Sequence, residues 1–151
     1  MGIIRVAVTQ GGADTTGIEQ IDTQLTSDGK TGWQITRMQA YWENGYTADA
    51  ADQTLSAILC TQPSVPVPTD AEELARLNWA VSNTAGVAVT YPMDLIKETM
   101  AAADRVTVQP TLYAIVASTG TALANLVYFE IEYVEVKLSD VEVLRLLLGG
   151  A

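Results

Sequence analysis

The chain has 151 residues, and its 8 Lys and Arg residues against 18 Asp and Glu residues give a formal net charge of −10, with no histidine. This length suits one domain, and 48% hydrophobic with 17% charged residues excludes an intrinsically disordered chain. The acidity argues against binding DNA or RNA, because phosphate contacts need clustered Lys and Arg, and the basic residues here are scattered singly. The lack of histidine removes the commonest general base and the commonest zinc ligand.

Cys60 is the one cysteine of the chain, so no internal disulfide can form. Its place at the end of an apolar stretch, Leu55–Cys60, indicates a buried and unreactive thiol. The opening residues, Met1–Arg5, lack the pattern of a signal peptide, and no window approaches the roughly 18 apolar residues of a membrane span. We therefore expect a soluble, acidic protein made in a cytoplasm.

The first part of the chain has the pattern of short strands separated by turns. Ile3–Thr9 is a β-branched run that stops at a Gly pair, and Ile18–Leu25 alternates apolar and polar residues with one slip of phase. Ser27–Lys30 is a turn signal, since its Asp-Gly pair favours the positive φ of tight hairpins. Two further strands are predicted at Trp33–Trp42 and Gln53–Thr61.

The middle of the chain departs from this pattern. Pro63, Pro66 and Pro68 mark an extended connection, and Thr69–Glu72 forms a capping box. In such a box the Thr hydroxyl and the Glu carboxylate each satisfy a free backbone N–H at a helix start. The sequence therefore predicts one short helix inserted between strands, continuing over Glu73–Leu77.

Strands return in the second half, and they are predicted at Trp79–Ser82, Val87–Tyr91, Arg105–Val108, Thr111–Ser118 and Leu126–Leu138. One or two helical turns are predicted within Asp94–Ala103. The chain closes with a second capping box, Ser139–Glu142, and a short helix over Val143–Leu148 that stops at a Gly pair.

The strand at Leu126–Leu138 is the most informative. Apolar residues occupy alternate positions in its first half, at Val127, Phe129, Ile131 and Tyr133. Glu130 and Glu132 lie on the opposite face, and beyond Tyr133 the apolar phase switches by one residue. Such a slip is produced by a β-bulge or by a strand that crosses between two sheets.

About eight strands without strand–helix alternation indicate an antiparallel sandwich or barrel. Eight strands in two sheets most economically form a jelly roll, which manages its sheet edges with two Greek keys. We predict an all-β, eight-stranded antiparallel jelly-roll sandwich, one domain over residues 1–151, with one short inserted helix and a short C-terminal helix. An immunoglobulin-like sandwich is the alternative, although the Cys–Trp–Cys spacing of antibody domains is absent.

No phosphate loop, nucleophile elbow, zinc signature or EF-hand loop occurs in the sequence, so no catalytic residue, cofactor or metal ligand is predicted. Glu130 and Glu132 lie about 7 Å apart on one strand face. That spacing suits a pair of glycosidase carboxylates, but a solvated outer face is the favoured interpretation.

Acidic residues in and near the turns raise the question of calcium, which takes several carboxylate oxygens at once. The candidate groups are Asp14, Glu19 and Asp22, and separately Asp49 and Asp52. Neither group has a recognised ligand spacing, so ordinary solvating charge is favoured.

Aromatic residues offer a carbohydrate-binding hypothesis, and the candidates are Trp33, Tyr41, Trp42, Tyr46, Trp79, Tyr91 and Tyr113. Trp33 and Trp79 begin strands and are expected in the core. Tyr41, Trp42 and Tyr46 flank a turn and form the most convincing exposed cluster, for which core packing or a subunit contact is favoured over sugar binding.

The C-terminal helix is apolar on more than one face, and a helix of this kind is buried against its own sandwich, a neighbour, or both. Its predicted interface residues are Val141, Leu144, Leu147 and Leu148, which join Tyr41, Trp42 and Tyr46.

Four segments follow a familiar order: the turn and strand at Asp28–Trp33, the run Trp79–Tyr91 before a long connection, the closing strand Val127–Tyr133, and the helix start at Leu138–Arg145. In pattern and order, over nearly the whole chain, the protein resembles the single-jelly-roll capsid proteins of tailless icosahedral viruses. The resemblance implies a virion protein made in the host cytoplasm, without catalytic residues, whose partners are copies of itself and other capsid proteins.

The chain departs from many jelly-roll shell proteins of RNA viruses, which carry a long basic N-terminal arm. Its first predicted strand starts at about Ile3, and the sequence is acidic throughout. We therefore expect a shell without direct genome contact, over an internal membrane or a second protein layer. A monomeric binding module, for sugar or a surface partner, is the alternative, and a hydrolase using Glu130 or Glu132 is a third hypothesis.

Overall fold

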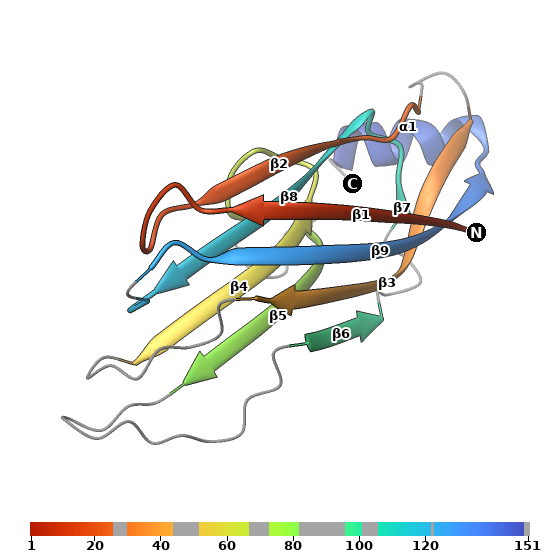
Figure 1. The fold of residues 1–151 in the computed structure, drawn as a ribbon. Coiled ribbons are helices and arrows are strands. Elements are labelled where there is room, and N and C mark those ends of the chain that lie inside the picture. Colours follow the sequence, from red (N-terminus) through yellow and green to blue (C-terminus); the bar gives the residue numbers. More distant parts are fainter. Residues whose placement is uncertain are drawn as a thin grey trace.

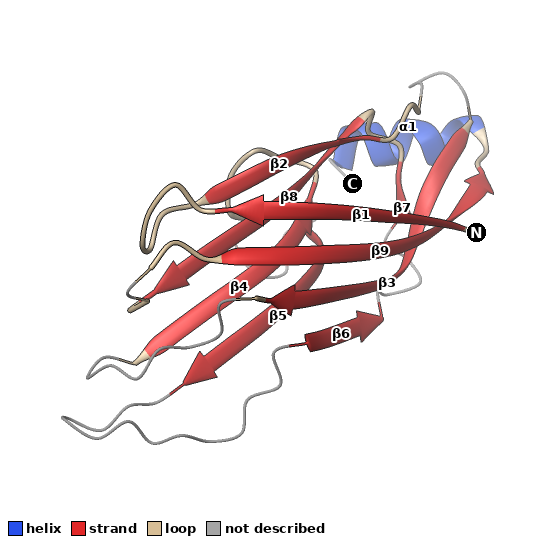
Figure 2. Cartoon of the chain, viewed as in Figure 1, coloured by secondary structure: helices blue, strands red, loops and turns tan. Residues whose placement is uncertain are grey.

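The computed structural model describes residues 1–25, 30–43, 52–66, 73–81, 96–100, 106–121 and 123–149. Within them, nine strands and one helix are formed: β1 (Gly2–Thr9), β2 (Gly17–Asp22), β3 (Thr31–Trp42), β4 (Gln53–Cys60), β5 (Glu73–Val81), β6 (Ile96–Met100), β7 (Val106–Thr107), β8 (Thr111–Thr119), β9 (Leu126–Lys137) and α1 (Asp140–Gly149). The strands build two antiparallel sheets, one of five strands and one of four (Figures 1 and 2).

The strand pairs are nested along the chain, as in a long hairpin rolled onto itself. β1 pairs with β9, β2 with β8, β3 with both β6 and β7, and β4 with β5. When this long hairpin is rolled up, β3 also pairs with β9 and β4 with β8. The strand order is then β1-β9-β3-β6 in the five-stranded sheet, where β7 also pairs with β3, and β2-β8-β4-β5 in the four-stranded sheet. This is the jelly-roll arrangement, so the predicted fold class is confirmed.

The inserted helix is a wrong prediction. The four residues of its capping box, Thr69–Glu72, lie outside the described residues, but Glu73–Leu77, over which the helix is predicted to continue, begins strand β5. Leu77 and Trp79 of β5 are buried, and β5 pairs with β4 along its length. Tertiary pairing and burial therefore override a local helix-start signal.

Two details of the second half also differ from the prediction. The expected helical turns within Asp94–Ala103 are replaced by strand β6, which pairs with β3. β7 lies within the strand predicted at Arg105–Val108, so β6 is the one observed strand that no predicted strand covers, and the described residues form nine strands where about eight are predicted. The predicted strand at Val87–Tyr91 lies outside the described residues.

The hydrophobic core lies between the two sheets. Its largest buried side chains include Trp42, Trp79 and Phe129, and the rings of Trp42 and Trp79 meet edge to face with centroids 6.0 Å apart. Trp33 and Trp79 are buried as predicted. The inward phase of β9, with Val127, Phe129 and Ile131 buried, is likewise confirmed.

The predicted irregularity near Tyr133 exists, but it lies on the partner strand. The register of β3 against β9 shifts between Ile35 and Arg37, so that Thr36 is the extra residue of a β-bulge opposite Glu132 and Tyr133. The Thr36 hydroxyl donates a hydrogen bond to the Glu132 carbonyl at 3.2 Å. This bulge reverses which positions of β3 face the core in its second half.

The C-terminal helix is confirmed, and its capping box forms as predicted. Ser139 N–H donates to the Glu142 carboxylate at 2.7 Å, and Glu142 N–H donates to the Ser139 hydroxyl at 3.3 Å. α1 is not long or apolar enough to cross a membrane, nor is any other helix in the described parts of the chain. The helix lies at one end of the sandwich (Figure 1).

Candidate functional site on the outer face of the five-stranded sheet

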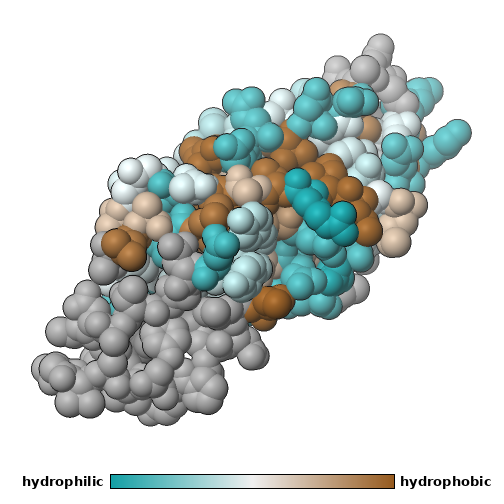
Figure 3. Space-filling model, viewed as in Figure 1, coloured by the Kyte–Doolittle hydropathy of each residue, from teal (hydrophilic) through white to brown (hydrophobic). Residues whose placement is uncertain are grey.

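The register of the five-stranded sheet arranges its outward side chains in rows that cross four strands. Ala7 of β1, Tyr128 of β9, Tyr41 of β3 and Ile96 of β6 are direct neighbours across the strands. They form what we call the apolar row, defined by these four residues. Figure 3 shows hydrophobic residues gathered in the middle of this face with hydrophilic residues beside them.

The centre of the apolar row is an aromatic pair. The rings of Tyr41 and Tyr128 are nearly parallel, with planes 12° apart and centroids separated by 6.2 Å. Tyr128 is nevertheless 43% exposed. Tyr41 covers the side of Tyr128 toward β3, whereas on the β1 side the neighbour is only the small side chain of Ala7. One side of the Tyr128 ring is therefore left open.

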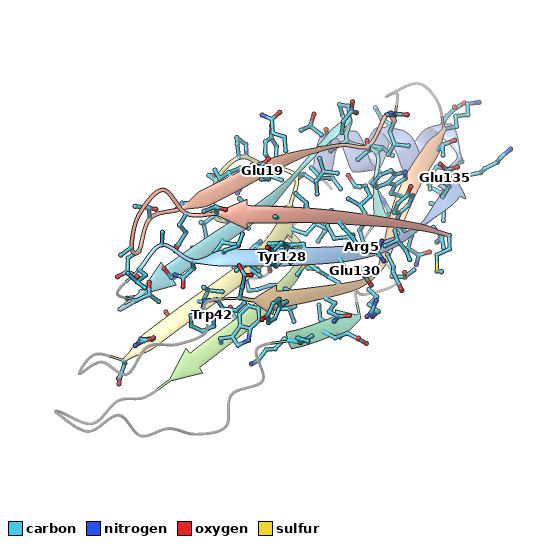
Figure 4. The ribbon with its side chains drawn as sticks, in the orientation of Figure 1. Arg5, Glu19, Trp42, Tyr128, Glu130 and Glu135 are labelled. Atoms are coloured by element: carbon cyan, nitrogen blue, oxygen red, sulfur yellow. The ribbon has the colours of Figure 1, made fainter. Side chains whose placement is uncertain are left out.

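Charged side chains occupy the next two rows of the same face. Arg5 Nε donates to the Glu130 carboxylate at 3.0 Å (Figure 4). Arg37 contacts three carboxylates, those of Glu98 at 2.9 Å, Glu132 at 3.0 Å and Glu130 at 3.4 Å. These five residues form a continuous network of ion pairs beside the apolar row.

The network favours the charged forms of Arg37 and Glu130. The hydrogen bond to Glu98 raises the pKa of Arg37, and the hydrogen bond from Arg5 is the main reason that the pKa of Glu130 lies below its usual value. A glycosidase acid needs a carboxyl whose pKa is raised. The setting of Glu130 is the opposite of that requirement, and it fits a carboxylate that accepts hydrogen bonds.

An open depression of about 370 Å³ lies between the apolar row and the first charged row. Its outward walls are made by Tyr128, Tyr41, Arg5, Glu130 and Gln39, and its floor includes Ala7. Arg37 donates a hydrogen bond to the Gln39 side-chain oxygen, so the Gln39 amide is held with its N–H groups available as donors. The depression thus joins an aromatic surface to fixed donors and acceptors.

The predicted exposed cluster around Tyr41 must be corrected. Trp42 is only 1% exposed, packs in the core, and donates its indole N–H to the Asn125 side-chain oxygen at 2.8 Å. The bulge at Thr36 is the physical reason, because it turns Trp42 inward and Tyr41 outward. Tyr46 lies outside the described residues.

On the C-terminal helix, Val141 and Leu144 are 76% and 58% exposed in the isolated chain. The side chains of Leu147 and Leu148 lie outside the described part of the structure. Asp140 of the helix forms an exposed ion pair with Lys30 at 3.1 Å.

Asp14, Glu19 and Asp22, the first group of acidic candidates for calcium, do not form a cluster of metal ligands in the described part of the chain. Asp14 accepts hydrogen bonds from Ser118, from the backbone of Gly120 and from both the backbone and hydroxyl of Thr121, at 2.8 to 3.0 Å. Asp22 accepts from the backbone of Gln24, and Asp49 lies outside the described residues. No group of three or more metal-ligating side chains occurs among the residues with described positions.

Cys60 is buried, as the sequence predicted. Its thiol lies 3.1 Å from the Gln62 carbonyl, and burial raises the pKa of the Cys60 thiol above its ordinary value. A thiol in this setting is protonated and weakly reactive.

We expect acid to destabilise the fold, because the pKa values of the Asp14 and Glu130 carboxyl groups are lowered in the folded protein. Burial raises the pKa of Asp14, but the hydrogen bonds from Thr121, Ser118 and Gly120 outweigh it and hold that pKa below the ordinary 3.8; the pKa of Glu130 is held below 4.5. Because both are lower in the folded state, their stabilisation is present above the unfolded-state pKa and is lost as the pH falls through the folded-state pKa.

We therefore expect the melting temperature to fall as the pH is lowered from about 5 to 3. Asp14→Asn should make the melting temperature depend less on pH. Thermal melts followed by circular dichroism would measure this dependence for the wild type and for the variant. Identical slopes for the wild type and the variant would contradict the assignment to Asp14.

Comparison with known proteins gives no further guide to the site, since neither a protein-family model nor a curated protein matches the chain.

Proposed function

We propose that this protein is a structural subunit that assembles with copies of itself into an icosahedral shell, as a capsid protein of a tailless virus. The observation that carries the proposal is the exposed apolar side of α1. Val141 and Leu144 are three positions apart, and residues at this spacing lie on the same side of a helix. An apolar helix side left open to water is typical of a surface that a partner covers.

The way in which α1 is attached supports a neighbour as that partner. The helix follows directly on β9, and extensive contacts between α1 and any strand are absent among the described residues. Val141 and Leu144 are thus held at the end of the sandwich without being buried by it. A second copy of the chain, which presents the same helix and the same sheet ends, is the occupant that we propose.

The charge of the chain supports an assembly that responds to salt. A net charge of −10 makes free subunits repel one another, and salt screens such repulsion over about 10 Å at 0.1 M. The same acidity argues against direct contact with the genome. In this proposal the protein resides in the virion, and an internal membrane or a second protein layer lies beneath its shell.

Electron microscopy of the purified chain, in low salt and then in high salt with calcium, tests the proposal. We expect hollow, closed particles of uniform size that appear or increase on addition of salt. A field of single subunits, or of irregular aggregates, under every condition would count against a self-assembling shell.

A monomeric binding module is the second candidate function, and the Tyr41–Tyr128 pair at the centre of the apolar row is the observation that favours it. An exposed tyrosine pair beside a fixed polar network is suited to a ligand whatever the oligomeric state. A strict monomer that binds a ligand on this face would favour this alternative.

A further inference from the structure

We infer that the depression beside Tyr128 is a binding site for a sugar residue of a neutral glycan. The inference goes beyond the proposed shell function and does not depend on assembly. It rests on three features of the outer face of the five-stranded sheet: an open aromatic ring, a small neighbour that leaves space, and a polar edge of matched donors and acceptors.

The aromatic feature is the open side of Tyr128. Tyr41 is stacked on the side toward β3, so the pair presents a flat surface toward β1. Ala7 lies directly opposite Tyr128 on β1, and its methyl group leaves the space that the depression occupies. A pyranose ring placed there would continue the row as a third stacked ring, with its C–H groups against the negative face of Tyr128.

The polar feature is the edge of the depression formed by the first charged row. Glu130 accepts bonds from Arg5 and Arg37, yet an ionised carboxylate offers about four acceptor sites. The Arg5 bond uses Nε, which is one of the five N–H donors of a guanidinium. Each sugar hydroxyl both donates and accepts, so neighbouring hydroxyls match a carboxylate and a guanidinium side by side.

The network also holds these groups in place before a ligand arrives. Arg37 bonds at once to Glu130 and to Gln39, both of which line the depression. Groups that are already oriented lose less conformational entropy on binding. Arg37 itself does not line the depression, so we assign it as a positioning residue.

The charge of the face selects a neutral ligand. Three carboxylates, those of Glu98, Glu130 and Glu132, outnumber the two guanidinium groups of Arg5 and Arg37. With a chain charge of −10, this excess of negative charge disfavours acidic glycans and nucleic acids. A neutral polyhydroxylated chain meets no such repulsion.

Isothermal titration of the full chain with neutral hexasaccharides tests the inference, with cellohexaose, maltohexaose, mannohexaose and chitohexaose as the probes and hexagalacturonate as the acidic comparator. We expect saturable binding of at least one neutral probe, with a Kd of about 1 mM or tighter, and none of hexagalacturonate. No binding of any neutral probe would overturn the inference, and so would preferred binding of the acidic one.

Two variants locate the binding at the depression. Tyr128→Ala removes the stacking surface and should weaken binding at least about tenfold. Ala7→Phe fills the space over β1 and should abolish binding while leaving the tyrosine pair intact. A thermal melt checks that each variant is folded, and retention of wild-type affinity in either folded variant would overturn the site.

Matched controls lie on the same face. Ile96→Ala trims the far end of the apolar row, beyond Tyr41, and Ile3→Phe adds the same ring to β1 outside the depression. Both should bind the probe as the wild type does. Particle formation is measured on the same samples, so a failed glycan site and a failed shell proposal give different results.

Discussion

Replacing Val141 and Leu144 together with glutamate is expected to leave the sandwich folded and to prevent assembly. Both side chains are largely exposed in the isolated chain, so the substitution removes little packing from the folded subunit. Between subunits, full burial of a Val or Leu side chain contributes roughly 1.5–3 kcal/mol. Two such losses at each contact weaken it by about 3–6 kcal/mol, which corresponds to a factor of at least about one hundred.

Sedimentation velocity in high salt measures this effect, and a thermal melt checks the fold. The double substitution also adds two negative charges, so the control chain adds the same charge elsewhere, as Thr9→Glu with Gln20→Glu on exposed strand positions. We expect the control to assemble and the helix variant to sediment as single subunits. Assembly of the helix variant at the wild-type level would contradict the role of α1.

Trp42→Ala is expected to cause the largest loss of stability of any single substitution discussed in this protein. Trp42 is buried against Trp79, and large-to-small substitutions of this kind cost about 3–5 kcal/mol. The change also leaves the Asn125 side-chain oxygen without its indole donor, which adds about 1–3 kcal/mol. Since domains are stable by only about 5–15 kcal/mol, the variant should lie close to the limit of folding.

Denaturant unfolding of three variants separates the contributions. Trp42→Phe keeps most of the ring packing and loses the N–H donor, so it should cost distinctly less than Trp42→Ala. Tyr41→Ala, one residue earlier but on the outer face, should cost at most about 1.5 kcal/mol. Equal losses for Tyr41→Ala and Trp42→Ala would contradict the inward and outward assignment of these two neighbours.

That assignment shows where prediction from the sequence stops. The strands predicted at Trp33–Trp42 and Leu126–Leu138 agree closely with the observed bounds of β3 and β9, and in the first half of the second strand the apolar residues alternate. A strict period of two from Trp33 would place Tyr41 inward and Trp42 outward. The bulge at Thr36 inverts this, and nothing in the sequence of β3 alone marks Thr36 as the extra residue.

The residues of the candidate site cannot be grouped from the sequence for a related reason. Arg5 and Glu130 are neighbours on the sheet but 125 positions apart in the chain, and Arg37 and Glu132 are 95 apart. Their pairing depends on the register between distant strands, which one sequence does not encode in a readable form. Tyr128 stands within an alternating strand, and its outward direction was implied, but its partners Tyr41 and Ala7 were not.

The helix predicted over Glu73–Leu77 is wrong for a different reason. A capping box describes a local preference worth little against the burial of a strand. Leu74, Leu77 and Trp79 are all buried in the core, and β5 completes an edge of the four-stranded sheet. The equivalent signal at Ser139–Glu142 is followed by the predicted helix, and in the described parts of the two sheets no strand pairs with the residues of α1.

The solution mass of the wild-type chain, measured by light scattering across a salt series with and without calcium, tests the central proposal most directly. The proposal predicts that the mass rises with salt from near the 16.1 kDa of one chain to that of a large, uniform particle. A mass that stays at one chain across the whole series would contradict a self-assembling shell subunit.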